Sequence, residues 1–324
     1  MTKSARYKIA TAITGTVLAI GGLFNQHQKD PNTILDKDTN IQYTYTDQNG
    51  MQVYGVLDDT QTLSTRIQSN SVIEKTSMFI AYDEDAPPPI KRYLPTIMNG
   101  LLSWPANGDR SARWIPAPGG VSVGHPDITY GTIGDQVTYN GNTNCFITNA
   151  HVAGGLDGGK VGDRIVQPGA HHGGTQTIGY IVAMVTPLKD VTNSVDVAVV
   201  CGERGNVYPG IYGVGQVNGV YEDPYIGMQA VKCGVTSGCT VLTLEAMDVT
   251  IKIGYYTKDS RLPKMRTFAH QMMWSGKGSP GDSGSLIVGS NKMISLLYAG
   301  NEDEQRVMGN DPAYILKALP GLVP

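Results

Sequence analysis

The feature that most constrains the fold of this chain is an alternation of short apolar runs and glycines that begins after Gly120. The runs are four to eight residues long, are rich in Val, Ile and Thr, and end at turn-forming residues, which is typical of strands. A content of 40 Gly, 18 Pro and 17 Tyr also favours short strands over helices. We therefore expect an all-β body, with strands at residues 127–131, 145–149, 178–185, 195–200, 230–233, 240–244, 249–256, 284–288 and 293–299.

The expected strands form two series on either side of a Gly- and Tyr-rich stretch at residues 205–225. A chain of 324 residues is long enough for about two globular units, so two consecutive β units are predicted. A short helix is expected near the C-terminus. Asp311 stands at a capping position there, Pro312 at the first helical position, and Pro320 closes the segment.

The N-terminus contains a mostly apolar run at residues 9–24, preceded by Lys3, Arg6 and Lys8. The run is short for a membrane span, which needs about 20 residues, and better suits the apolar core of a signal peptide. No clear small-residue cleavage site follows it. An uncleaved anchor and a buried or partner-binding helix therefore stay open, and export or anchoring is as well supported as a cytoplasmic location.

Residues 26–115 differ in amino-acid composition from the rest of the chain. Their first part is polar, with a hairpin predicted where β-prone runs flank the turn Asp47-Gln-Asn-Gly50. Pro87-Pro-Pro89 and Pro116-Ala-Pro-Gly-Gly120 mark boundaries, because proline does not continue a helix or a central strand. We expect an appendage of unknown role, and a chain that starts near Ile115 is expected to stay soluble without it.

Charge and cysteine content exclude some functions and leave others open. With 25 Lys and Arg against 28 Asp and Glu, no basic footprint indicates nucleic acid, and membrane contact is expected only through residues 9–24. The four cysteines contain no CxxC pattern. Cys233 and Cys239 flank a loop that a disulfide can close in an oxidising compartment, but free thiols fit equally well, and the pairing of Cys145 and Cys201 is also open.

The strongest chemical signal is the segment Gly278-Ser-Pro-Gly-Asp-Ser-Gly-Ser-Leu-Ile-Val288, a glycine-dense turn that leads into an apolar strand. Such a turn presents Ser283 on tightly bent backbone, and the amides of Gly281 and Ser283 can converge on an oxyanion. The alternative is an ordinary hairpin turn in which Asp282 acts as a local cap.

Two further segments carry a histidine and a carboxylate. His151 lies at the exit of the strand in Cys145-Phe-Ile-Thr-Asn-Ala-His-Val152, and Asp196 leads into the apolar strand of Ser194-Val-Asp-Val-Ala-Val-Val200. Either residue alone has a structural interpretation, as a satisfied histidine or as a turn cap. A buried carboxylate nevertheless needs a partner, and an imidazole that must be oriented is one. The side chains of two adjacent residues such as His171 and His172 do not easily point at one ion, so no metal site is expected.

The order His151, Asp196, Ser283 is the order found in chymotrypsin. The blocks TNAHV, SVDVAVV and SPGDSGSLIV each resemble a motif of trypsin-like serine peptidases. Residues 131–134, 160–169, 227–238 and 296–300 look like the bacterial branch related to plant Narrow-leaf-type peptidases, and the resemblance spans roughly residues 117–321.

The resemblance implies an all-β, two-barrel chymotrypsin-like fold with an N-terminal extension and a short C-terminal helix. It also implies a serine endopeptidase without a cofactor, with His151 as base and acid, Asp196 as its orienter, Ser283 as nucleophile, and the amides of Gly281 and Ser283 as oxyanion hole. The expected organisation is a candidate signal or anchor segment at 1–25, the extension at 26–115, a first barrel at 116–215, and a second barrel with the helix at 216–324.

Specificity and activation are less determined by the sequence. The resemblance places Lys277, six residues before the nucleophile, at the base of the substrate pocket, with Tyr298 and Gly300 at its wall. The alternative is that Lys277 points to solvent. No activation site supplies a new amino terminus to pair with Asp282, so no trypsinogen-like activation is expected. The substrate is expected to be a protein or peptide, and the rival function is a noncatalytic binding or structural protein on the same barrels.

Overall fold

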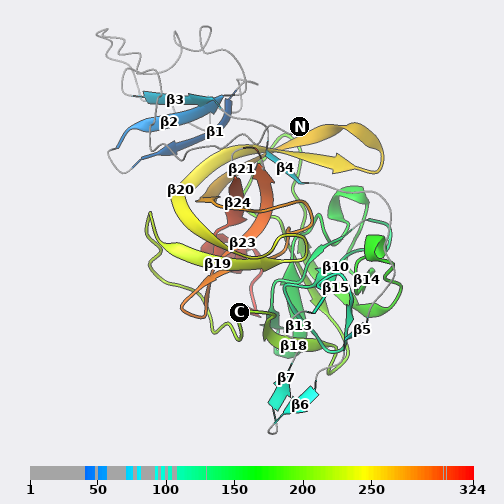
Figure 1. Cartoon of the computed structure of the whole chain (residues 1–324). Coiled ribbons are helices and arrows are strands. Elements are labelled where there is room, and N and C mark those ends of the chain that lie inside the picture. Colours follow the sequence, from blue (N-terminus) through cyan, green and yellow to red (C-terminus); the bar gives the residue numbers. More distant parts are fainter. Residues whose placement is uncertain are drawn as a thin grey trace, which may run out of the picture.

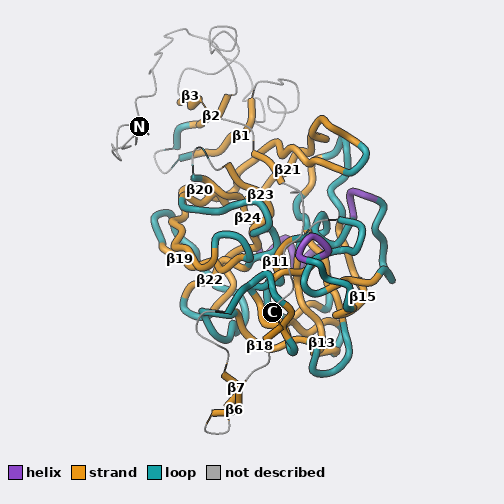
Figure 2. The backbone as a smooth tube through the Cα atoms, turned by 45° about the vertical axis from the view of Figure 1, so that its right-hand side comes forward, coloured by secondary structure: helices purple, strands orange, loops and turns teal. Residues whose placement is uncertain are grey.

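The computed structural model describes most of the chain from residue 108 onward and shorter segments before it. The described residues are 41–47, 50–56, 71–75, 79–81, 92–93, 96–98, 101–103, 108–128, 130–301, 303 and 305–324. Figure 2 shows this part of the chain as strands and loops, with helix confined to short turns. The predicted signal or anchor segment, residues 1–25, lies outside the described residues.

The second barrel is a ring of six described strands, in which each strand pairs with the next and β19 pairs again with β20. β20 and β21 are its longest strands, with 20 and 16 residues. Leu242, Leu244, Trp274 and Ile287 share one buried apolar cluster with further strand residues. In ring order the strands are β20 Gly238–Thr257, β21 Ser260–Ser275, β24 Arg306–Asn310, β23 Lys292–Asn301, β22 Leu286–Gly289 and β19 Gln229–Gly234.

The first barrel is built on a second sheet, whose strand order is β14-β15-β17-β13-β12-β25. The last strand of the chain, β25, belongs to this sheet and pairs with β12, so the C-terminus returns from the second barrel to the first. The bounds are β12 Gln136–Tyr139, β13 Asn142–Thr148, β14 Arg164–Val166, β15 Thr177–Val185, β17 Val197–Cys201 and β25 Leu322–Val323.

Short paired strands and helical turns make up further secondary structure in the described residues, besides the strands named above. The pairs are β5 Arg92–Tyr93 with β8 Arg113–Trp114, β6 Thr96–Met98 with β7 Leu101–Ser103, β9 Ala117–Gly119 with β18 Val207–Ile211, β10 Ser122–Val123 with β11 Gly131–Thr132, and β16 Thr192–Asn193 with β21. The helical turns are η2 Gly155–Asp157, η3 Ala170–His172 and α2 Pro312–Ala318.

The C-terminal helix is confirmed. α2 begins at Pro312, and the side chain of Asp311 accepts a hydrogen bond from the amide of Ala313 at 2.8 Å, as the capping pattern predicts. No helix in the described ranges is long and apolar enough to cross a membrane.

Both cysteine pairs are disulfide-bonded, Cys145 to Cys201 and Cys233 to Cys239. In each pair the two cysteines face each other on neighbouring antiparallel strands. The predicted hairpin disulfide is therefore present, and none of the described cysteines is a free thiol.

The N-terminal extension contributes strands to the sheet of the second barrel. The predicted hairpin is present as β1 Ile41–Thr46 and β2 Gln52–Val56. β1 pairs with β20, β2 pairs with β3 Ser71–Lys75, and β4 Phe79–Ala81 pairs with both β20 and β23 (Figure 1). This differs from the expectation of a separate appendage. The physical reason is a long-range strand pairing, which the composition of residues 26–115 does not reveal.

Tyr43 anchors this attachment. Its side chain is fully buried in the apolar cluster that contains Ile251 and Ile253 of β20, and its hydroxyl accepts a hydrogen bond from Arg306 Nη1 at 3.0 Å.

We predict that Tyr43→Ala lowers the free energy of unfolding by about 3 kcal/mol, because it removes a large buried side chain and leaves a cavity against β20. The matched control is Tyr180→Ala, since Tyr180 is 54% exposed on β15. That change is expected to cost less than about 0.5 kcal/mol. Urea unfolding of both variants makes the comparison, and equal midpoints would show that the extension does not stabilise the second barrel.

Candidate active site

The register of two neighbouring strands brings His151 to Asp196. Thr148, the last residue of β13, pairs with Ala198 near the start of antiparallel β17. The residues that follow β13 and those that precede β17 therefore lie at the same end of the sheet. His151 Nδ1 lies 2.6 Å from Asp196 Oδ2, and the His151 amide donates to Asp196 Oδ1 at 3.1 Å.

Asp196 is a fully buried carboxylate whose charge is compensated by hydrogen bonds. Besides the two from His151, Tyr255 Oη on β20 donates to Asp196 Oδ2 at 2.9 Å. Burial and the neighbouring carboxylate raise the pKa of Tyr255 well above its usual value, so its hydroxyl remains a donor. A carboxylate in its ionised form only accepts, so with Asp196 in that form Nδ1 of His151 donates in this contact and Nε2 faces away from it.

The backbone of Asp196 is fixed by two asparagines. Asn149 Nδ2 donates to the Asp196 carbonyl at 2.8 Å, and the Asp196 amide donates to Asn310 Oδ1 at 2.8 Å. Asn310 lies on β24 and Tyr255 on β20, so the second barrel holds a carboxylate that the first barrel supplies. Tyr255, Asn149 and Asn310 were not predicted as site residues. Of the three, only Asn149 could have been found from the sequence, since it lies within the TNAHV block.

The Ser283 turn has backbone that only glycine fits at two positions. Gly281 and Gly284 have φ angles of +91° and +95°. A Cβ on Gly281 would lie 2.2 Å from Cε2 of Tyr130, and one on Gly284 would lie 2.1 Å from the carbonyl oxygen of Thr132. The Thr132 amide in turn donates to the Ser283 carbonyl at 2.8 Å. The turn is thus packed against the first barrel.

The two amides expected to form an oxyanion hole are available. Neither the Gly281 nor the Ser283 amide has a hydrogen-bond partner among the residues that the structure describes. Thr236 Oγ1 donates to the Pro280 carbonyl at 2.6 Å. In a trans peptide the N–H points opposite to the C=O, so this bond turns the Gly281 amide away from Thr236.

The hydroxyl of Ser283 donates to the carbonyl of Tyr298 on β23 at 3.3 Å. Within the described ranges it makes no hydrogen bond to His151. Serine–histidine contacts are often long in proteins without bound substrate and tighten when it binds, and rotation about one side-chain bond redirects the hydroxyl.

Asp282, next to Ser283, is the second fully buried carboxylate. Lys232 Nζ lies 2.6 Å from its Oδ2 and is itself buried, and the Ser237 hydroxyl also donates to Oδ2. The amides of Thr236, Ser237 and Ser279 add hydrogen bonds of 3.0, 3.1 and 3.0 Å. Burial lowers the pKa of Lys232. The charge of Asp282 acts in the opposite direction but is the smaller effect, so the pKa lies below its usual value. Asp282 therefore has a cation partner within the chain, in line with the expectation that no new amino terminus is needed.

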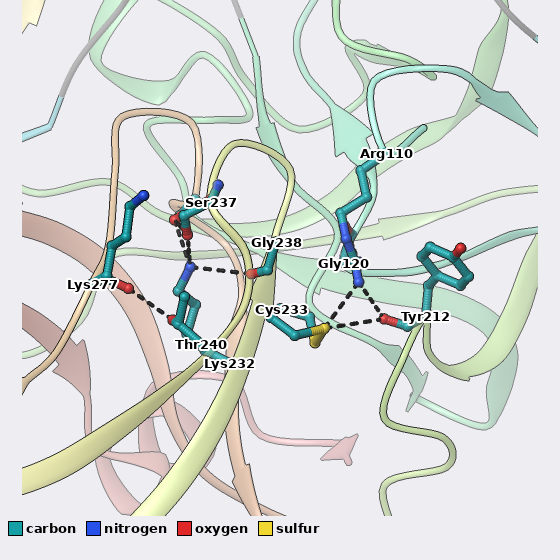
Figure 3. Close-up of a disulfide and its surroundings, with 11 residues drawn as sticks. Arg110, Gly120, Tyr212, Lys232, Cys233, Ser237, Gly238, Thr240 and Lys277 are labelled. Atoms are coloured by element: carbon teal, nitrogen blue, oxygen red, sulfur yellow. Dashed lines mark hydrogen bonds and ion pairs between the residues drawn. A yellow bond between two sulfur atoms is a disulfide. The ribbon is translucent and has the colours of Figure 1, made fainter. Parts of the chain in front are cut away.

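The hairpin that contacts Asp282 is closed at its base by the Cys233–Cys239 disulfide (Figure 3). Arg110 connects this disulfide to the first barrel. Its guanidinium donates to the carbonyls of Gly120 and Tyr212 at 2.9 and 2.8 Å and lies 3.0 Å from Cys239 Sγ. The hairpin is thus held at its disulfide by the covalent bond and by the guanidinium of Arg110.

The residues expected in a substrate pocket are not all open to solvent. The Lys277 side chain is exposed, and its carbonyl accepts a hydrogen bond from Thr240 at 2.8 Å (Figure 3). Tyr298 is buried with its ring 4.9 Å from that of Phe268, so it reaches Ser283 only through its carbonyl. Gly300 lies two residues further along β23.

The paired histidines contact Ser122 and Tyr130. His172 Nδ1 lies 2.7 Å from the Ser122 hydroxyl, and Tyr130 packs on its ring with centroids 4.1 Å apart. Burial lowers the pKa of His172 to about 4, so the ring is neutral at physiological pH. The described residues include no group of three or more His, Cys, Asp or Glu placed to hold a metal ion.

No protein-family model and no curated protein matches this chain. Solved structures do. The chymotrypsin of Cellulomonas bogoriensis is 21% identical, with a TM-score of 0.47 over 64% of this chain and 97% of that one. Protease A of Thermobifida fusca is 18% identical (TM-score 0.48, 64% and 96%), and the Nocardiopsis protease is 19% identical (0.48, 64% and 97%).

These neighbours are bacterial serine proteases with the two-barrel fold. The predicted fold class, an all-β double barrel with one short C-terminal helix, is confirmed by the strand pairing and the helix of the structure itself. At these identities the likeness concerns the fold alone. The narrower resemblance to the branch related to plant Narrow-leaf-type peptidases stays a prediction.

We predict that Lys232→Met lowers the free energy of unfolding by about 3–5 kcal/mol, because it leaves the buried carboxylate of Asp282 without its cation. The matched control is Lys189→Met, which breaks an ion pair between Lys189 and Asp190 whose side chains are 74% and 81% exposed. It is expected to cost at most about 1 kcal/mol. Urea unfolding measures both, and a loss at Lys232 no larger than at Lys189 would contradict the account of Asp282.

Proposed function

We propose that this protein is a serine endopeptidase that hydrolyses protein or peptide substrates through an acyl-enzyme intermediate. The observation that carries the proposal is the 2.6 Å contact between His151 and the fully buried Asp196, in a fold whose glycine turn presents Ser283 beside two amides that have no hydrogen-bond partner among the described residues. A turn that served only to join two strands would need neither the contact between His151 and Asp196 nor two amides without a partner among the described residues. His151, Asp196 and Ser283 are the proposed triad.

In the proposed reaction, Nε2 of His151 removes the Ser283 hydroxyl proton as Oγ attacks the carbonyl carbon of a peptide bond. The amides of Gly281 and Ser283 bind the oxyanion of the tetrahedral intermediate. Protonated His151 then gives its proton to the leaving amine, which yields the acyl-enzyme. Water, activated by the same imidazole, releases the acid and restores Ser283. These steps need no cofactor.

Asp196 acts through His151. Its carboxylate keeps the proton on Nδ1 and stabilises the imidazolium that forms in each transfer. Tyr255 donates to Oδ2, the same carboxylate oxygen that His151 Nδ1 contacts, and its ring lies 5.5 Å from that of His151. We propose that Tyr255 positions the pair.

Specificity remains a prediction. Lys277 at the base of the pocket would favour acidic side chains before the cut. Its exposed side chain also fits the alternative, in which it points to solvent. Tyr298 and Gly300 keep their proposed place at the pocket wall, Tyr298 through its backbone.

We predict that a fluorophosphonate probe labels the wild type and that Ser283→Ala abolishes labelling, because the probe phosphonylates an activated serine. Ser279→Ala is the matched control: Ser279 lies in the same turn and contacts Asp282 through its amide, which the substitution keeps. Labelling of Ser283→Ala would show that the activated residue is not Ser283, and no labelling of the wild type would favour the rival noncatalytic protein.

The contribution of the other two proposed triad residues follows from the same mechanism. Asp196→Asn should reduce turnover by up to about 10⁴ through loss of the correct tautomer. A His151→Ala/Ser283→Ala double variant should be little worse than either single variant, since the triad acts as a unit. Additive losses in peptide hydrolysis would count against it.

A further inference from the structure

A short strand of the N-terminal extension lies between two strands that contact the proposed active site. β4, Phe79–Ala81, runs parallel to β20, with Ile80 opposite Gly254 and Ala81 opposite Tyr255. On its other side it runs antiparallel to β23, with Ile80 opposite Gly300 (Figure 1).

Both flanking strands touch the proposed triad at the level of β4. The Tyr298 carbonyl, which accepts the Ser283 hydroxyl, lies two residues before Gly300, or about 7 Å along the strand. On β20, Tyr255 opposite Ala81 is the residue that donates to Asp196. β4 therefore pairs with both of the strands that contact Ser283 and Asp196.

Among the described strands, only β4 pairs with β23 on the side opposite β24 beyond residue 296. On one side, β23 pairs with β24 along residues 296–301. On the other side, its pairing with β22 ends at Leu296, and Leu297 exchanges hydrogen bonds with residues 284 and 285 of the Ser283 turn. Beyond Leu297, the strand that pairs with β23 on this side in the described part of the chain is β4, opposite Gly300, while the Tyr298 carbonyl accepts the Ser283 hydroxyl.

An extended peptide is the partner that such an edge accepts. Peptides commonly bind by adding a strand to an exposed sheet edge, where backbone hydrogen bonds provide affinity. An edge that leads to the nucleophile is therefore where a peptide substrate would lie. This step rests on the proposed function.

We propose that residues 79–81 occupy in cis the sheet edge that a peptide substrate needs, so that the intact chain is autoinhibited toward peptides. A substrate must displace β4 from β23 before it can pair there. Its apparent affinity is then reduced by the fraction of molecules in which the edge is free. A chain with the edge free in one molecule in ten would show about a tenfold higher KM than one in which it is always free.

The test compares Ile80→Pro with Ile80→Ala in the full chain. Proline lacks the amide proton and is excluded from central strands, whereas alanine keeps the backbone pairing. We expect Ile80→Pro to raise kcat/KM for a chromogenic tetrapeptide substrate about tenfold, mainly through a lower KM. Ile80→Ala should behave like the wild type. A second variant with three glycines in place of residues 79–81 keeps the chain length and carries the same expectation if the proline variant does not fold.

Fluorophosphonate labelling separates this inference from the proposed function. The probe is small and needs Ser283 but no sheet edge, so its labelling rate should be equal in the wild type and in every variant of residues 79–81. If the wild type does not label, the proposed function fails. If the wild type labels and the folded variants show an unchanged kcat/KM, the autoinhibition is overturned while the proposed function stands.

Discussion

The burial of the Asp282 carboxylate is the constraint on which the geometry of the site depends. A charge removed from water must be compensated, and here Lys232, the Ser237 hydroxyl and three backbone amides do so. Two of those amides belong to the hairpin closed by Cys233 and Cys239, and the third belongs to the Ser283 turn itself. The same set of bonds therefore fixes the turn and the hairpin beside it. In the loop held in this way, the amides of Gly281 and Ser283 have no hydrogen-bond partner among the described residues.

A second buried carboxylate joins the two barrels. Asp196 comes from the first barrel together with His151, but its side chain and its amide are held by Tyr255 and Asn310 of the second. The two barrels must therefore pack correctly before the imidazole is oriented. Arg110 makes another link of this kind, from the first barrel to the Cys233–Cys239 hairpin. The site lies at the junction because each of its parts is completed by the opposite barrel.

The sequence predicted those features that are encoded locally. The capped helix after Asp311, the glycine turn at Ser283 and the strands before His151 and after Asp196 all follow from residues close together in the chain. β21 was not predicted, because Pro263, Lys264 and Arg266 interrupt its apolar pattern and its stability comes from pairing with β20 and β24. The expected strand at 127–131 is limited to Gly131, at the start of β11.

Contacts between residues that lie far apart in the sequence could not be predicted from sequence patterns. Lys232, Tyr255 and Asn310 each lie 50 or more residues from the aspartate that they contact, at separations of 50, 59 and 114. The attachment of β1 and β4 to the second barrel has the same origin, since backbone pairing leaves little trace in side-chain composition.

The central claim is that Ser283 forms a covalent acyl intermediate in this geometry. Its most direct test is to mix the wild-type chain with an activated ester, quench in acid within seconds, and locate the acyl group by peptide mass spectrometry. The account predicts one acyl group per chain, on the peptide that contains Ser283, with release of the alcohol in a burst of equal size. An acyl group on another residue, or turnover of the ester without any acylated chain, would contradict it.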